Sequence, residues 1–265
     1  MKENVTLEEM RAIQLDILDK VDELCRQNEI RYSLGGGTLL GAIRHKGYIP
    51  WDDDVDIMMP RPDYEKFLNL FLDGFGHMKI QHYKNSKYCL KPFAKVYDDR
   101  TVLKERFQEC GVYIDVFPID GLPEETSLIP FIEEYQYQLS RLHRSTSTFK
   151  FNHNLWVGLK EVCKRVIDPP RRVVVENFEK FITQFPFESS VYAGAITGRY
   201  AEKEHMEADV FKTYIDVPFE GRTYKSIANY DAYLKKHYGD YMKLPPKEQQ
   251  ISNHDYRVWW KKRGR

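Results

Sequence analysis

Two aspartates separated by one residue, Asp54 and Asp56, are the residues whose type and spacing most directly suggest chemistry. If this stretch is extended, both carboxylates project from one face while Val55 and Ile57 enter the core on the other. Carboxylates held side by side repel each other unless a cation lies between them, and such oxygen ligands suit Mg²⁺ or Mn²⁺. The same spacing also occurs in acidic surface turns. The pair alone therefore leaves a metal site and a solvated turn as alternatives.

A third aspartate, Asp115, lies between apolar neighbours in the segment 113–117, which predicts a buried strand. An isolated buried carboxylate is unfavourable, so Asp115 needs a partner. A metal ion shared with Asp54 and Asp56 would provide one. A structural salt bridge to a lysine or arginine is the alternative. We interpret Asp120, just beyond, as a turn residue.

Phosphate-binding features surround these acids in the sequence. Three glycines at 35–37 precede a short helix that contains Thr38. Glycine lets a phosphate approach the backbone, and the N-terminus of a helix favours an anion. A plain flexible turn is the alternative. Cationic residues follow at 44–46, where they could hold phosphate oxygens or form a solvated basic loop, and Lys95 lies in an apolar segment where a buried ammonium needs an anion.

The elements that must position these residues alternate between helix and strand in the first half of the chain. Thr6 and Glu9 form a capping box that opens a helix over 6–28. Further elements expected are strands at 31–34, 55–59 ended by Pro60, 92–97 and 112–117 stopped by Pro118, a helix from Pro62 through Phe71, mostly helical structure over 126–185, a hairpin over 211–224 turning near Glu220 and Gly221, and a helix over 229–238. This predicts an α/β (α+β) fold with a mixed sheet and a mainly helical second lobe, divided into 1–122 and 123–265.

Composition excludes several classes of protein. Forty basic and forty acidic residues give no net charge, so nucleic acid is not an expected partner. The chain has no apolar run long enough to cross a membrane and no apolar signal region at its start. The cysteines are scattered, which predicts reduced thiols in a cytoplasmic protein without a zinc site: Cys25, Cys89, Cys110 and Cys163.

The order of glycine turn, helix, Asp-x-Asp strand and separate carboxylate strand resembles that of nucleotidyltransferase-fold enzymes. The run GGGTLLGAIRHKGYIPWDDDVDI at 35–57 resembles the signature of the LicD family of phosphocholine transferases. Segments 95–101, 114–121 and 238–246 also resemble this family. The resemblance spans most of the chain and is weakest over 126–210.

The resemblance implies a transferase that moves phosphocholine from CDP-choline to a glycan hydroxyl of a teichoic acid precursor and releases CMP. Asp54, Asp56 and Asp115 would be the catalytic and metal-binding residues, holding Mg²⁺ or Mn²⁺, with Asp115 as candidate proton acceptor. The candidate substrate-binding residues are Gly36, Gly37, Thr38, Arg44, His45, Lys46 and Lys95. Transfer of another phospho-substituent, such as a polyol phosphate or a nucleotidyl group, and a non-catalytic nucleotide-binding module are the alternatives.

Two further expectations concern aromatic residues. Choline would need an aromatic cage, for which Tyr48, Trp51 and Tyr113 are candidates, although packing also explains each of them. A lipid-linked acceptor would be met at the inner membrane face. The basic residues at 261–265, after Trp259 and Trp260, could form a peripheral contact there, or the tryptophans could pack in the core.

Overall fold

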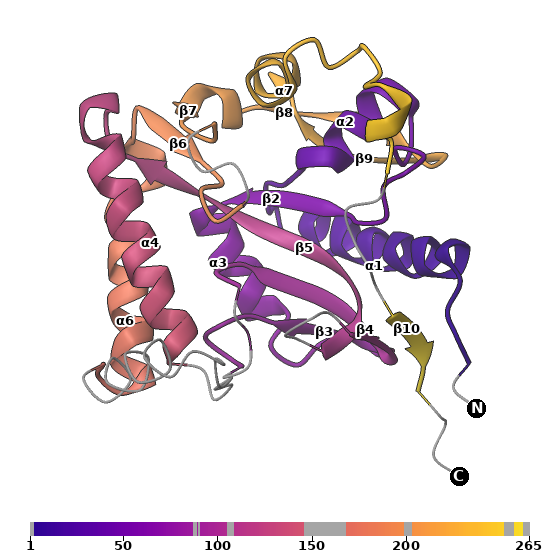
Figure 1. The fold of residues 1–265 in the computed structure, drawn as a ribbon, viewed down its shortest axis with the longest axis horizontal. Helices are drawn as coiled ribbons and strands as arrows, with labels where there is room; N and C mark the ends of the chain where they lie inside the picture. Colours follow the sequence, from indigo (N-terminus) through magenta and orange to yellow (C-terminus); the bar gives the residue numbers. More distant parts are fainter. Residues whose placement is uncertain are drawn as a thin grey trace.

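A mixed sheet forms the centre of the fold in the computed structural model (Figure 1). The structure describes residues 3–86, 89, 91–104, 109–145, 168–198, 203–251 and 257–261. The main path of the sheet follows the order β1 (Ser33–Leu34), β2 (Asp56–Pro60), β5 (Glu109–Leu122), β4 (Ala94–Lys104) and β10 (Arg257–Trp260). β2 and β5 are parallel, and the other pairs are antiparallel. Three short strands extend the sheet: β3 (Met78–Gln81) on β4, β6 (Tyr192–Gly194) on β5, and β7 (Met206–Glu207) on β6.

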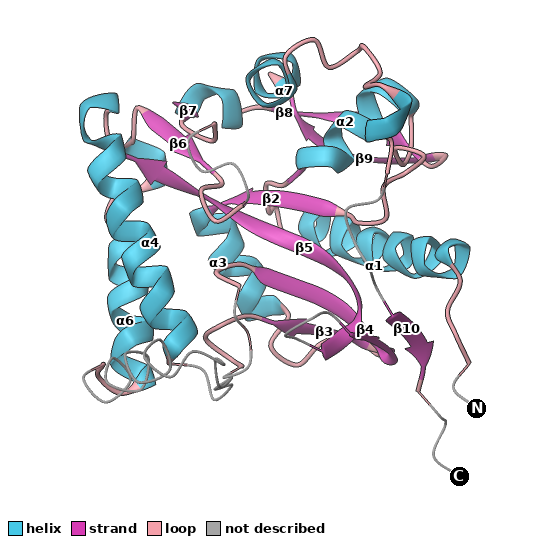
Figure 2. Cartoon of the chain, in the orientation of Figure 1, coloured by secondary structure: helices cyan, strands magenta, loops and turns pink. Residues whose placement is uncertain are grey.

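Six α-helices lie in the described part of the chain (Figure 2). They are α1 (Leu7–Gln27), α2 (Gly36–His45), α3 (Arg61–Leu70), α4 (Leu128–Arg144), α6 (Arg171–Ile182) and α7 (Tyr230–Tyr238). α1 packs against β4 and β5, and α3 packs against β2 and β5. Short 3₁₀ turns occupy Glu125–Ser127, Phe187–Ser189, Ala208–Phe211 and Lys247–Gln249. The predicted α+β class with a mixed sheet is therefore confirmed.

The first helix begins where its capping box predicts. The Thr6 hydroxyl accepts the backbone N–H of Glu9 at 3.1 Å, and the Glu9 carboxylate accepts the backbone N–H of Thr6 at 2.8 Å. These bonds satisfy two amide groups that would otherwise lack partners at a helix start. Ile17, Leu18 and Val21 are fully buried on the face toward the sheet, as their spacing predicts.

A hairpin over β8 (Tyr214–Phe219) and β9 (Arg222–Ile227) lies beside α2, and its predicted turn at Glu220 and Gly221 is confirmed. Both turn residues have positive φ, which the right-handed twist of the strands favours in a two-residue hairpin turn. The Glu220 carboxylate accepts the backbone N–H of Tyr48 at 2.9 Å. The hairpin thereby fixes the loop that leads from α2 to the acidic segment.

The prediction that Pro118 stops its strand is wrong, because β5 continues to Leu122. The Asp115 N–H points to the β2 side, where it donates to the carbonyl oxygen of Val55. Successive amides alternate between the two edges of a strand, so the position of Pro118 faces the other edge. On that edge the pairing of β4 ends opposite Val116 and that of β6 begins opposite Asp120. Proline therefore removes no ladder hydrogen bond there.

The interpretation of Asp120 as a turn residue is also wrong. Asp120 lies in β5 with 1% of its surface exposed, and Arg61 donates to both of its carboxylate oxygens, at 2.6 and 2.7 Å. This two-pronged ion pair gives the buried carboxylate the partner it needs. It joins the start of α3 to β5.

α4 and α6 pack side by side along one edge of the molecule (Figure 1). They share a second apolar cluster centred on Phe131, Leu142 and Phe178. α6 begins directly after Pro170, its N-cap residue. Residues 146–167 of the predicted helical region, including Cys163, lie outside the described residues. The division at residue 122 falls at the end of β5 and stays a prediction.

The described end of the chain returns to the sheet through β10. Trp259 pairs with Val102 and Trp260 with Thr101 on β4, and Trp260 packs against the main core. Residues 262–265 lie outside the described residues, so the membrane contact stays a prediction. Over the described ranges, the helices are too short or too polar to cross a membrane.

Candidate active site

A cavity of about 1020 Å³ opens between the start of the acidic strand, α2, α4 and α7. Six of the predicted site residues line it together: Gly36, Gly37, Arg44, Asp54, Asp56 and Asp115. Thr38, His45, Lys46 and Lys95 do not belong to this lining. The structure thus brings the three acids and the glycine turn to one place.

The acids meet because two strands run parallel. Asp56, the first residue of β2, lies opposite Asp115 of β5 in the register. Val55 and Ile57 are buried, with 1% and 0% of their surfaces exposed. The alternation predicted from the sequence is therefore confirmed. Asp54 and Asp56 both face the cavity.

Negative charge accumulates at this point. Burial raises the pKa of Asp56 well above its ordinary value, and the charges of Asp54, Asp115 and Asp52 raise it further, while Lys95 lowers it. Such repulsion is relieved when a cation binds. Within the described ranges, no group of three or more His, Cys, Asp or Glu side chains is gathered tightly enough to hold a metal ion as it stands. The metal site therefore stays a prediction.

Asp115 has a lysine partner. The Lys95 Nζ lies 2.9 Å from the Asp115 carboxylate, and the side chain of Lys95 is only 2% exposed. The ammonium also lies 3.2 Å from the centre of the Tyr113 ring, which adds a cation–π contact. The sequence left a shared metal ion and a salt bridge as alternatives for Asp115, and the structure contains the salt bridge to Lys95. A bound cation would add to it. Lys95 faces the carboxylate from behind the cavity lining, and a contact of Lys95 with phosphate stays a prediction.

The glycine turn is pressed against the acids. Gly36 has a φ of +46°, and a Cβ placed on it would lie 3.2 Å from Asp56 Oδ2. A Cβ on Gly37 would lie 2.8 Å from Asp52 Oδ2. Thr38 accepts the backbone N–H of Asp56 at 2.9 Å, so it positions the acidic strand from below the surface. A side chain at Gly36 or Gly37 would therefore crowd the carboxylate of Asp56 or Asp52.

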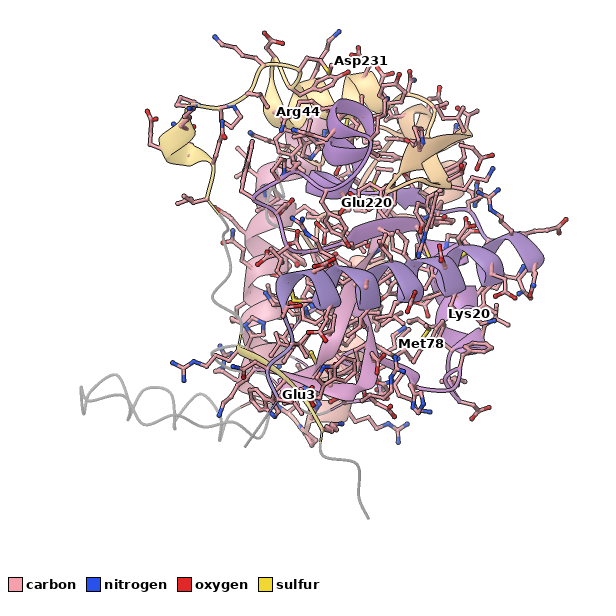
Figure 3. The ribbon with its side chains drawn as sticks, turned by 90° about the vertical axis from the view of Figure 1, so that its right-hand side faces the viewer. Glu3, Lys20, Arg44, Met78, Glu220 and Asp231 are labelled. Atoms are coloured by element: carbon pink, nitrogen blue, oxygen red, sulfur yellow. The ribbon has the colours of Figure 1, made fainter. Side chains whose placement is uncertain are left out.

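The cationic residues after α2 have different surroundings. Arg44 donates from Nη1 to the carbonyl oxygen of Tyr241 at 2.8 Å, and Tyr241 donates its hydroxyl to Asp231 at 2.9 Å. Figure 3 shows Arg44 and Asp231 at the same end of the molecule. Lys46 is exposed, with its Nζ 3.2 Å from the carbonyl oxygen of Ile43. Substrate contacts of these residues stay predictions.

His45 follows Arg44 at the end of α2. It packs edge-on against Trp51, with ring centres 6.3 Å apart. Partial burial and then the Arg44 guanidinium lower the pKa of His45. Through its contact with Trp51, His45 supports a ring that lines the cavity, although His45 itself does not.

Aromatic residues of the cavity differ from the three proposed for a choline cage. Trp51 lines the cavity, but Tyr48 lies beneath Arg11, 4.6 Å from the guanidinium, and Tyr113 beneath Lys95. Six other aromatic residues also line the cavity: Phe93, Phe117, Tyr135, Tyr233, Tyr238 and Tyr241. Sequence reasoning missed these because they come from segments far apart in the chain.

Sequence reasoning also missed a buried acid–histidine pair in the cavity wall. Glu204 and His237 have 5% and 4% of their surfaces exposed, and His237 Nε2 lies 3.0 Å from the Glu204 carboxylate. His237 Nδ1 lies 2.9 Å from the carbonyl oxygen of Tyr233, one turn earlier in α7. Both residues line the cavity with Thr197. The spacing of Tyr233 and His237 is only that of a helical face, so it carries no signal of a site.

Comparisons with known proteins match the segments that carry the three acids and the glycine turn. A family model described as LicD/FKTN/FKRP, nucleotidyltransferase domain, matches residues 29–153. The lipopolysaccharide cholinephosphotransferase LicD of Haemophilus influenzae is 34% identical over 263 residues, covering 94% of this chain and 96% of that protein. An uncharacterized protein of Rickettsia prowazekii is 47% identical over 117 residues, covering 43% of this chain and 42% of its own length. One of Rickettsia typhi is 31% identical over 134 residues, covering 49% and 41%.

Proposed function

Because the chain belongs to the LicD family, we propose that it transfers phosphocholine from CDP-choline to a hydroxyl of a glycan. The observation that carries this proposal is the meeting of Asp54, Asp56 and Asp115 with the glycine turn in one cavity. Partly buried acids that repel one another favour a cation-assisted reaction at phosphate over simple binding of a neutral ligand.

The carboxylates fit Mg²⁺ or Mn²⁺ by their chemistry. All three offer oxygen ligands, and the raised pKa of Asp56 reflects a charge that a cation would offset. Asp54, Asp56 and Asp115 would hold the ion, which when bound would neutralise charge on the diphosphate.

The chain's own residues would position the reactants. The backbone at Gly37, at the positive end of α2, would offer its N–H group to a phosphate, and the absence of a side chain at Gly36 would let that phosphate approach. The acceptor oxygen forms a bond to the phosphorus of phosphocholine, the bond from that phosphorus to the CMP oxygen breaks, and the acceptor proton passes to Asp115. Lys95 holds Asp115 in place for that role. CMP leaves with the electrons of the broken bond.

The acceptor and the cellular location are proposals of their own. The Haemophilus influenzae relative is named for lipopolysaccharide. For this chain we propose the glycan of a lipid-linked teichoic acid precursor, reached from the cytoplasm at the inner membrane face. Nucleic acid is not a proposed partner, since the charges of the chain balance.

A donor panel tests the proposal. The protein is incubated with Mg²⁺ and a teichoic acid precursor, and separately with CDP-choline, CDP-ribitol or CTP. We expect CMP and a phosphocholine-bearing glycan from CDP-choline alone, no product in EDTA, and recovery on adding Mg²⁺ or Mn²⁺. CMP from CDP-ribitol would favour polyol phosphate transfer, and pyrophosphate from CTP would favour nucleotidyl transfer. Nucleotide binding with no product from any donor would favour a non-catalytic module.

A further inference from the structure

One hydroxyl in the cavity wall is buried without a partner. Thr197 has 5% of its surface exposed, and within the described part of the chain its Oγ1 makes no hydrogen bond. It lies in a turn closed by the N–H of Gly198, which donates to the carbonyl oxygen of Ala195 at 2.9 Å. Thr197 lines the cavity. Because a buried polar group without a partner costs free energy, this hydroxyl marks a place where a ligand group would be stabilised.

A carboxylate supports the same turn. Glu204 Oε2 accepts the N–H of Ala195 at 3.3 Å, so the acid and Thr197 are held at the same corner of the cavity. His237 fixes the other oxygen of Glu204. Its Nδ1 faces a carbonyl oxygen, which only accepts, so Nδ1 carries a hydrogen and one further proton lies between Nε2 and Glu204. The pair is therefore held as a neutral unit, suited to hydrogen bonding with an uncharged polar group.

This corner adjoins the acids. A Cβ on Gly198 would lie 3.9 Å from the ring of Phe117. Phe117 follows Asp115 by two residues on the same face of β5, a separation of about 7 Å along a strand. On the other side, the buried Tyr233 hydroxyl accepts a hydrogen bond from the backbone of Gly36. Tyr233 also stacks on His237, with ring centres 4.1 Å apart. The corner thus lies between the acidic strands and the glycine turn.

We propose that Thr197 and Glu204 form a subsite for a hydroxyl group of a sugar ring. A threonine hydroxyl both donates and accepts, the carboxyl group accepts, and a sugar hydroxyl can pair with both. The inference rests on the proposed function, because both substrates of that reaction carry sugar hydroxyls. The ring is either the ribose of the nucleotide or a sugar of the acceptor glycan.

Hydroxyl deletion on both partners tests this subsite. Thr197→Val keeps the shape and removes the hydroxyl, Thr197→Ser keeps the hydroxyl, and Thr223→Val is a control on the exposed side of β9. Calorimetry measures the binding of CMP, 2′-deoxy-CMP and 3′-deoxy-CMP, each in the presence of Mg²⁺. Saturation-transfer NMR measures the binding of methyl galactoside and methyl N-acetylgalactosaminide to the CMP-loaded protein. These readouts do not require turnover, so a failure of phosphocholine transfer is detected separately.

The expected result is a loss confined to one class of ligand. If the ribose binds there, Thr197→Val lowers the affinity for CMP by about threefold to tenfold but leaves the affinity for one of the two deoxy analogues unchanged. If the acceptor binds there, Thr197→Val lowers the affinity for the glycosides by a similar factor and leaves the affinity for CMP unchanged. Thr197→Ser and Thr223→Val should bind like the parent. Equal affinities of the parent and Thr197→Val for every probe would overturn the inference. Since Thr197→Val removes an unpaired hydroxyl, its Tm should equal or exceed that of the parent.

Discussion

Asp56 on β2 and Asp115 on β5 lie directly opposite each other in a parallel register, at the edge of the cavity. Replacing Asp56 by asparagine removes one of the charges that raise local repulsion and one proposed cation ligand. We expect Asp56→Asn to lower kcat by at least about a thousandfold, while the Tm without Mg²⁺ stays equal or rises. Asp54→Asn should behave in the same way. Turnover assays with Mg²⁺ and thermal melts in EDTA measure both effects.

Asp53 provides a matched control in the same acidic run. It adjoins Asp54 but is absent from the cavity lining, and its backbone carbonyl accepts from Gln14 at 2.9 Å. Asp53→Asn should keep kcat within about threefold of the parent, a difference of under about 1 kcal/mol. Near-parental kcat for Asp56→Asn would remove the basis for the metal assignment. A loss of activity in Asp53→Asn as large as in Asp56→Asn would indicate a general effect of charge in the run.

Lys95 is buried and its ion-pair partner Asp115 is partly buried, so removal of the partner of either charge should destabilise the protein more than removal of both charges. Lys95→Met leaves the carboxylate without its ammonium, and we expect it to lower the free energy of unfolding by about 3–5 kcal/mol. Lys95→Met with Asp115→Asn should recover much of that loss. Urea denaturation measures the stabilities. Equal losses in the single and double variants would show that the pair is not coupled.

Gly36 has positive φ and lies close to Asp56 Oδ2. Gly36→Ala should strain the backbone by about 1 kcal/mol, and its methyl group should push against the carboxylate. We expect kcat to fall by about tenfold or more, which corresponds to an increase of about 1.4 kcal/mol or more in the activation free energy. Gly221→Ala is the matched control. Its φ is +71°, but a Cβ there has no heavy atom within 4 Å in the described structure. It should lose similar stability and keep its activity. Equal activity in the two variants would contradict a special role for the glycine turn.

The arrangement of Asp54 and Asp56 could be predicted from the sequence because it depends only on the two-residue alternation of side chains along an extended segment. Alternation along a strand places Asp54 and Asp56 on one face and Val55 and Ile57 on the other, whatever the rest of the fold does. The apolar neighbours of Asp115 also suffice to predict a strand. Its meeting with Asp56 depends on a parallel pairing of strands that lie far apart in the sequence. The sequence indicates that pairing only indirectly, through the need of a buried carboxylate for a partner and through the family resemblance.

The remaining features depend on contacts between distant segments. Glu204 and His237 come from a short connection and from α7, and neither segment has a motif that predicts the other. The continuation of β5 through Pro118 depends on where β4 and β6 end on one edge of the sheet. Lys95 was expected to need an anion, and the sequence could not decide between phosphate and a carboxylate. In each case the chemistry of the single residue was readable, but its partner was not.

His82 provides a pH-dependent test of the packing between β3 and the following loop. It has 4% of its surface exposed, and its Nδ1 accepts the backbone N–H of Lys84 at 3.3 Å, so the proton lies on Nε2. Within the described residues Nε2 has no hydrogen-bond partner. Burial, and then the charge of Lys84, lower the pKa of His82 from 6.5 to about 4. The folded protein therefore favours the neutral ring.

The unfolded chain takes up this proton first as the pH falls. The contribution of His82 to stability is therefore intact above pH 6.5 and is lost between pH 6.5 and 4, by at most about 3 kcal/mol. His82→Gln removes this titration, so the decrease in unfolding free energy from pH 7.5 to 4.5 should be smaller than in the parent by about 2 kcal/mol. Urea denaturation at both pH values measures it. His77→Gln is the control for a histidine substitution that leaves buried packing intact, because the His77 side chain is 63% exposed. The same acid-induced loss in His82→Gln and in the parent would show that His82 titrates as an ordinary histidine.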